Sequence, residues 1–253
     1  MMDTLVTVLD SLKNAATVPL RTAKAWRNLA GKMPSVDLAY NKVRQELCDV
    51  GLLSEGVGLD EIELIVATLP SMGEAGYVFD EGLPWWASLS GFKPGVIYLP
   101  ADLPFVTYVP GGTMVDVIRH EYAHSWRWLA PEFFEQQWFV KAFGSTYSDA
   151  NYSGKRAWIE KHLRRKSFQN SLHRCRTEET KDDLIQREFS KEFVSDYGSN
   201  YPCEDFAETF RHYLRYRNSV ERFKARAGVY RKLKAVERAI HMTSRRLGLN
   251  ERG

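Results

Sequence analysis

The chain has 253 residues, of which 44% are hydrophobic and 26% are charged, and its formal net charge at pH 7 is +3. This composition predicts a folded globular protein with a sizeable core, and it excludes a disordered or fibrous chain. No stretch approaches the roughly 20 consecutive apolar residues that a membrane-spanning helix requires.

The N-terminus gives no sign of a targeting segment. Asp3 and Asp10 interrupt its apolar residues, so we expect no Sec signal peptide, and their acidity also argues against a transit peptide. The three cysteines, Cys48, Cys175 and Cys203, are widely spaced and odd in number. Because a disulfide framework needs paired cysteines, this usage favours a reducing compartment. The expected location is the cytoplasm or, for an exported protein, a Sec-independent route.

The first 110 residues combine helical and strand-like patterns. Residues 3–30 are typical of one or two amphipathic helices, and residues 36–53 and 60–69 of two more. The Gly- and aromatic-rich runs 76–79 and 95–99 indicate strands. The sequence therefore predicts a small sheet preceded by helices.

The remainder of the chain is predicted to be helical. Thr113 and Asp116 are spaced as in a capping box, so a helix is expected to begin there and to end at Ala130. Pro202 suits the first turn of another helix. The remaining predicted helices cover residues 132–143, 156–168, 178–196 and about 229–247. The predicted class is a helix-rich α+β fold with a small mixed sheet.

The predicted helix from Thr113 contains the sequence His120-Glu121-Tyr122-Ala123-His124. Residues four apart share one helix face, so both imidazoles can reach one zinc ion. Glu121 projects from the adjacent position and can accept a proton from water without binding the metal. The pattern therefore predicts a zinc site with a catalytic base.

A catalytic zinc site needs a third protein ligand and an open position. The extended motif with a later Gly and His is excluded, because Arg127 and Ala130 occupy those positions. Glu204 and Glu208 lie one turn apart at the start of a predicted amphipathic helix. Either carboxylate can be the ligand and the other can support a histidine; we choose Glu204 because it is nearer the helix start.

The two motifs together resemble the glutamate zincins (gluzincins). An HExxH helix is followed by Tyr197, six residues, and then Glu204-Asp-Phe-Ala-Glu208. This arrangement is most similar to the catalytic domain of anthrax lethal factor and to the bacterial Pro-Pro endopeptidases. The resemblance covers about residues 95–130 and 195–215. It implies a zincin-like fold, a Zn²⁺ cofactor and hydrolysis of protein or peptide substrates.

The resemblance also implies a role for each matching residue. The implied zinc ligands are His120, His124 and Glu204. Glu121 would be the general base, and Tyr197 would stabilise the oxyanion. Glu208 would not bind the metal but would accept a hydrogen bond from a ligand histidine. The strand 95–99 would pair with an extended substrate.

The ends of the chain leave alternatives open. We expect a helical extension over residues 1–55, a zincin-like domain over 56–216 and a basic helical segment over 217–253. Residues 211–253 carry 13 Lys/Arg against 3 Asp/Glu, which suits a nucleic-acid-associated protease as well as a solvated helix face. A secreted effector or toxin acting on particular proteins is one possible role, and a non-catalytic binding module that retains the fold is the other alternative.

Overall fold

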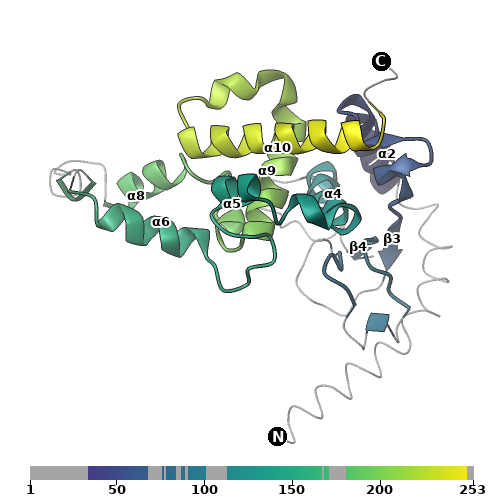
Figure 1. The fold of residues 1–253 in the computed structure, drawn as a ribbon, viewed down its shortest axis with the longest axis horizontal. Coiled ribbons are helices and arrows are strands. Elements are labelled where there is room, and N and C mark those ends of the chain that lie inside the picture. Colours follow the sequence, from purple (N-terminus) through teal and green to yellow (C-terminus); the bar gives the residue numbers. More distant parts are fainter. Residues whose placement is uncertain are drawn as a thin grey trace, which may run out of the picture. The chain divides into compact units, whose positions relative to one another are not determined.

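The computed structural model describes residues 34–67, 76, 78–83, 87–88, 91–100, 113–166, 168–170 and 181–249 (Figure 1). The chain divides into two compact units. The first ends at Ala130 and resumes at Thr243, and the second runs from Pro131 to Met242. The helices predicted over residues 3–30 lie outside the described residues.

The first unit is built on two helices, α2 (Pro34–Asp49) and α4 (Met114–Leu129), which pack against each other. The buried face of α2 is largely apolar and includes Val36, Val43 and Leu47, each at most 4% exposed. The predicted helix over 36–53 is therefore confirmed, although it ends at Asp49.

Between α2 and α4, the described part of the first unit contains four short strands. Strands β1 (Leu53–Ser54) and β2 (Val57–Gly58) form an antiparallel pair. Strands β3 (Leu64–Ala67) and β4 (Ile97–Pro100) form a parallel pair. Within the described residues, these are two separate pairs and not one mixed sheet.

Two predictions in this region were wrong. Residues 60–69 were expected to be helical, but a 3-10 turn, η1 (Leu59–Glu61), leads directly into β3. The run Leu64-Ile-Val-Ala carries two β-branched residues, which pack well on a pleated strand. Among residues 76–79, those described are not in a strand. Phe79 instead packs its ring against Phe92 and Tyr98.

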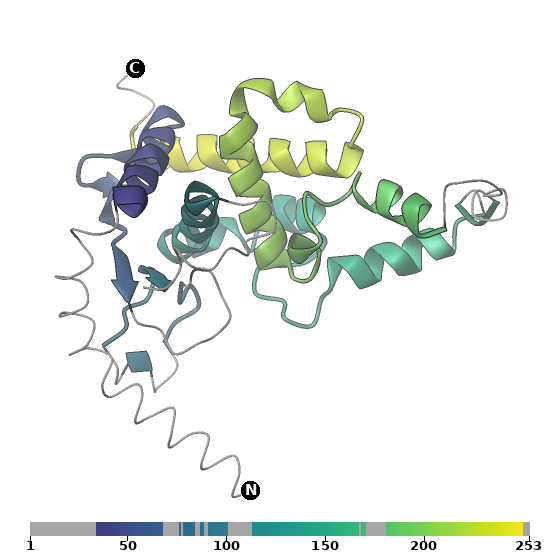
Figure 2. The same ribbon diagram turned by 180° about the vertical axis from the view of Figure 1, so that it is seen from behind.

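In its described part, the second unit contains helices and no strands. Its elements are η3 (Pro131–Phe133), α5 (Gln137–Phe143), α6 (Gly154–Leu163), α8 (Lys181–Phe189), η4 (Tyr197–Ser199), α9 (Pro202–Tyr216), η5 (Arg217–Phe223) and α10 (Ala227–Arg246). Figure 2 shows α6 and α8 side by side. The helix predicted over about 229–247 is confirmed as α10, and the one predicted over 156–168 corresponds to α6, which ends at Leu163. The helix predicted over 132–143 begins only at Gln137, after η3, and the one predicted over 178–196 ends at Phe189.

Aromatic side chains form the centre of the second unit. Phe206 on α9 is fully buried and has ring contacts with Phe134, Phe139, Phe143 and Tyr147. Three of these contacts are edge-to-face, an arrangement that stabilises the core beyond the burial of apolar area. This cluster fixes the buried face of α9 and therefore the direction of its first turns.

The last turn of α10 belongs to the first unit. Trp126 of α4 donates a hydrogen bond from Nε1 to Oγ1 of Thr243 at 3.2 Å, and both side chains are buried. None of the described helices is both long and apolar enough to cross a membrane.

Candidate metal centre

Helix α4 carries the candidate metal-binding motif, and its start is fixed by a capping box. Thr113 accepts a hydrogen bond from the backbone N–H of Asp116, whose carboxylate accepts one from the Thr113 N–H at 3.0 Å. Two backbone groups at the helix end are thereby satisfied. The start predicted at Thr113 is confirmed, and the helix ends at Leu129, one residue before the predicted end.

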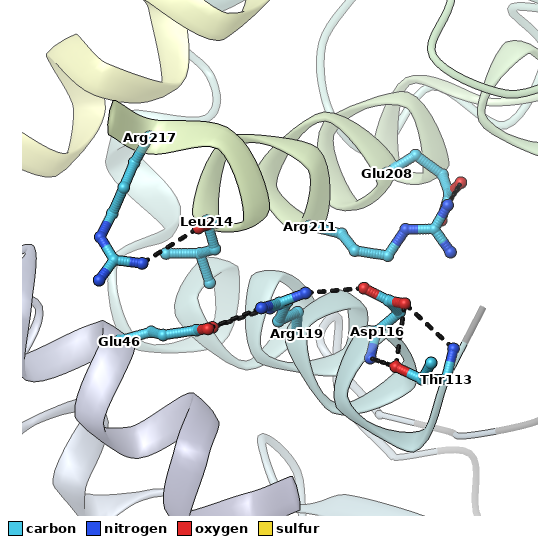
Figure 3. Close-up of polar contacts among 8 residues, drawn as sticks. All are labelled: Glu46, Thr113, Asp116, Arg119, Glu208, Arg211, Leu214 and Arg217. Atoms are coloured by element: carbon cyan, nitrogen blue, oxygen red, sulfur yellow. Dashed lines mark hydrogen bonds and ion pairs between the residues drawn. The ribbon is translucent and has the colours of Figure 1, made fainter. Parts of the chain in front are cut away.

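A buried ionic network then joins α4 to α2 (Figure 3). Arg119 donates to Asp116 at 2.7 Å and makes two hydrogen bonds to Glu46 at 2.8 and 2.6 Å. Burial alone would raise the pKa of Asp116. Hydrogen bonds from Thr113 and the charge of Arg119 outweigh burial and lower that pKa overall. Asp116 therefore stays ionised at neutral pH and keeps its ion pair with Arg119, which in turn links α4 to Glu46 of α2.

The two histidines of the motif point their Nε2 atoms at each other. Both side chains are buried, and the two nitrogens lie 3.2 Å apart. Two nitrogens bound to one tetrahedral zinc at about 2.05 Å are separated by about 3.3 Å. The pair therefore already has the separation that a shared zinc ion requires, and the prediction that one helix face presents both imidazoles is confirmed.

Asp80 contacts the far side of His124. Its Oδ2 lies 3.2 Å from Nδ1 of His124, and its backbone carbonyl accepts a hydrogen bond from Arg127 at 2.9 Å. Our sequence reasoning did not identify Asp80. The one feature of the sequence that could have indicated it is its position, directly after the Gly- and aromatic-rich run 76–79.

Glu121, which follows His120 in the sequence, is buried, with 6% of its surface exposed. Gly76 approaches its carboxylate so closely that a Cβ on Gly76 would lie 2.6 Å from Oε1. The carboxylate therefore occupies space that a side chain at position 76 would fill.

The remaining predicted site residues belong to the second unit. Pro202 occupies the first turn of α9, as predicted, and Glu204 follows it in the same turn. Glu208 is buried, and its Oε2 lies 2.8 Å from Nη2 of Arg211 (Figure 3). Tyr197 stands on η4 with 44% of its surface exposed.

The turn η4 packs closely against α9. A Cβ on Gly198 would lie 3.1 Å from Cβ of Glu208, closer than most such contacts, so a side chain there would require a small shift. The hydroxyl of Ser199 is buried and donates to the carbonyl of Asp196 at 2.6 Å. The turn therefore places Tyr197 next to the helix that carries Glu204 and Glu208.

A buried ion pair holds the first turn of α9 against α10. Lys232 is 2% exposed, and its Nζ lies 2.7 Å from Oδ2 of Asp205 and 3.9 Å from the ring centre of Phe193. It also donates to the carbonyl of Glu192 at 2.9 Å. Burial raises the pKa of Asp205 to about 6, against the opposing charge of Lys232. This contact orients the turn that contains Glu204.

His212 of α9 and the cysteines lie in other surroundings. His212 packs between the rings of Tyr216 and Phe223, and burial lowers its pKa to about 4. Cys48 and Cys203 are free thiols, whereas Cys175 lies outside the described residues.

A buried helix that carries HExxH with two converging imidazoles is the arrangement typical of zinc-dependent peptidases. Residues 110–246, more than half of the chain, match the family described as "Putative zinc-binding metallo-peptidase", and the chain belongs to this family. Zn²⁺ is accordingly its metal, and a protein or peptide is its class of substrate. No curated protein and no solved structure matches the chain.

Proposed function

We propose that the protein is an endopeptidase of the gluzincin type, with the zinc bound at His120 and His124. The observation that carries the proposal is the 3.2 Å separation of their Nε2 atoms on a buried, capped helix. The match to a zinc-binding peptidase family supports the same reading.

We propose Glu204 as the third ligand. The three donors would be an imidazole nitrogen from each of His120 and His124 and a carboxylate oxygen from Glu204, the set that the paired sequence motifs imply. Two imidazoles and one carboxylate leave the fourth position of a tetrahedral zinc open, as catalysis requires. The burial of the first turn of α9 and the Lys232–Asp205 pair beside it support a fixed position for this carboxylate.

Zinc bound at this site would supply a Lewis acid that lowers the pKa of a water molecule and polarises the scissile carbonyl. Glu121 would accept a proton from the attacking water as the C–O bond forms, and would deliver it to the amine as the C–N bond breaks. Tyr197 would donate its phenolic hydrogen to the oxygen that gains negative charge. Its exposure on η4 suits a group that meets substrate.

The experiment that tests this function is the substitution Glu121→Gln. Because Glu121 makes no bond to the metal in this mechanism, the variant should keep zinc and its melting temperature while losing nearly all hydrolysis of a peptide library. Glu160→Gln, an exposed carboxylate on α6, is the matched control and should behave as wild type. Wild-type turnover by Glu121→Gln would overturn the assignment of the base.

The nucleic-acid alternative depends on unpaired positive charge near the C-terminus. Among the described residues from 211 onward, the cations that pair with carboxylates include Arg211 with Glu208, Lys224 with Glu221, Arg231 with Glu192, Lys232 with Asp205, and Lys234 with Glu237. This pairing reduces the charge available for phosphates. Nucleic-acid binding stays a prediction, and a gel shift that weakens steeply with added salt would support it. The effector role and the predicted domain boundaries also stay predictions.

A further inference from the structure

The segment from Gly76 to Asp80 lies outside the residues that match the family, yet it meets the metal-binding helix twice. Gly76 faces the carboxylate of Glu121, and Asp80 faces the imidazole of His124. One short segment therefore contacts both the proposed base and a proposed ligand.

We propose that Asp80 is the positioning residue of His124, and that Gly76 reserves the space for the carboxylate of Glu121. The proposal rests on the proposed function, since it takes His124 as a zinc ligand. Its geometric basis is the 3.2 Å contact between Oδ2 of Asp80 and Nδ1 of His124.

The contact with Asp80 selects one tautomer of His124. An ionised carboxylate only accepts hydrogen bonds, so it favours the imidazole with its proton on Nδ1. Nε2 of His124 then carries the lone pair that a metal needs. In the other tautomer, the Nε2 hydrogen would point at Nε2 of His120, 3.2 Å away, and the two histidines would bind each other in place of zinc.

Two anchors hold Asp80 in this position. Arg127, almost one turn after His124, donates to the backbone carbonyl of Asp80 at 2.9 Å. The preceding residue, Phe79, is buried in the aromatic cluster with Phe92, and its carbonyl accepts a hydrogen bond from Gly95 at 3.1 Å. Because both the backbone and the neighbouring side chain are fixed, the carboxylate loses little freedom when it meets His124.

Because Gly76 has no side chain, it leaves room for the carboxylate of Glu121. A Cβ there would lie 2.6 Å from Oε1 and 2.7 Å from Cδ of Glu121. The atoms in conflict belong to the end of a flexible side chain, so the carboxylate would move and the backbone would not. Gly76→Ala is therefore expected to displace the base while leaving the fold and the histidines in place.

The test of Asp80 is zinc affinity, measured by competition with a chromophoric chelator on the full-length protein. Asp80→Ala should weaken zinc binding by about 10–100-fold, the usual effect of removing the hydrogen-bond partner of a ligand histidine. Asp80→Asn keeps an acceptor oxygen but loses the charge, so its loss should be smaller. Glu81→Ala is the matched control, because it removes the adjacent, exposed carboxylate, and it should bind zinc as wild type does.

Two outcomes separate the inference from the function on which it rests. Folded Asp80→Ala and Asp80→Asn proteins that bind zinc as tightly as Glu81→Ala would overturn the role of Asp80. A His124→Ala protein that retains wild-type zinc affinity would instead overturn the metal site itself. Melting temperatures in excess chelator show whether each variant is folded. If Asp80→Ala does not fold, Asp80→Asn still decides the test.

The test of Gly76 is a separation of metal binding from turnover. Gly76→Ala should bind zinc with wild-type affinity but hydrolyse peptides about 10²-fold more slowly, because a displacement of about 1 Å is enough for such a loss. Wild-type turnover would overturn the role of Gly76. Loss of zinc without loss of fold would also overturn it, since the substitution would then act on the ligands and not on the base.

Discussion

Arg119 and Glu46 are joined by two parallel hydrogen bonds across 73 residues of sequence, and neither side chain is more than 10% exposed. The pair connects α2 to α4 one residue before the first histidine of the motif. Planar, bidentate pairing of this kind fixes geometry as well as supplying energy. The position of the candidate metal helix therefore depends on a residue far from it in the sequence.

The first prediction concerns this pair. Glu46→Ala should lower the free energy of unfolding by about 3–5 kcal/mol, because it leaves Arg119 buried with Asp116 as its one remaining carboxylate partner among the described residues. Urea denaturation measures the effect. Glu63→Ala removes a carboxylate that is 57% exposed and lies 3.5 Å from Lys93, and its effect should stay within about 1 kcal/mol. Equal losses in the two variants would contradict a special role for the buried pair.

The second prediction distinguishes the two carboxylates of α9. If Glu204 is the third ligand, Glu204→Ala should lose stoichiometric zinc. Glu208→Ala should weaken zinc binding only by about 10–100-fold, because it would remove a supporting hydrogen bond and not a ligand. Elemental analysis after gel filtration and chelator competition measure the two effects. The reverse ranking would identify Glu208 as the ligand.

The sequence predicted best those features that local chemistry determines. The capping pair of Thr113 and Asp116, the Pro202 start of α9 and the shared face of His120 and His124 each depend on residues within one or two turns of a helix. Such signals survive folding because few tertiary contacts can override them.

The failures arose where tertiary pairing decides the structure. The four residues of β3 are too few to distinguish helix from strand by periodicity, and their strand forms only because β4, more than 30 residues later, pairs with them. Asp80 and His124 are 44 residues apart and share no motif, so their contact was not predictable. The same holds for Glu46, which has the appearance of an ordinary charged residue on an amphipathic helix.

The third prediction concerns Tyr197. Tyr197→Phe removes only the hydroxyl of a residue that is 44% exposed, so stability and zinc content should not change. If the hydroxyl donates to the oxyanion, turnover should fall by about 10²–10³-fold. The matched control is Tyr201→Phe, four residues later and 48% exposed, which should retain wild-type turnover. If Tyr197→Phe were as active as Tyr201→Phe, Tyr197 would have no role in the mechanism.

The last prediction concerns the acid stability of the second unit. Burial lowers the pKa of His212 to about 4, and the positive charges of Arg226, Arg211 and Arg215 act in the same direction. Its Nε2 is buried and has no hydrogen-bond partner among the described residues. The unfolded chain takes up this proton near the ordinary pKa of about 6.5. Between these two values the unfolded state binds more protons, so stability falls as the pH falls.

Substitution of His212 by phenylalanine isolates this effect. The new ring suits the contacts with Tyr216 and Phe223, whose centres lie 4.7 and 4.9 Å from the imidazole. Above pH 7 the difference in unfolding free energy between the two proteins measures packing alone, because the histidine is neutral in both states. Between pH 7 and 4 wild type should lose roughly 2–3 kcal/mol more than His212→Phe. Denaturation at several pH values measures this, and a constant difference would show that His212 does not titrate on unfolding.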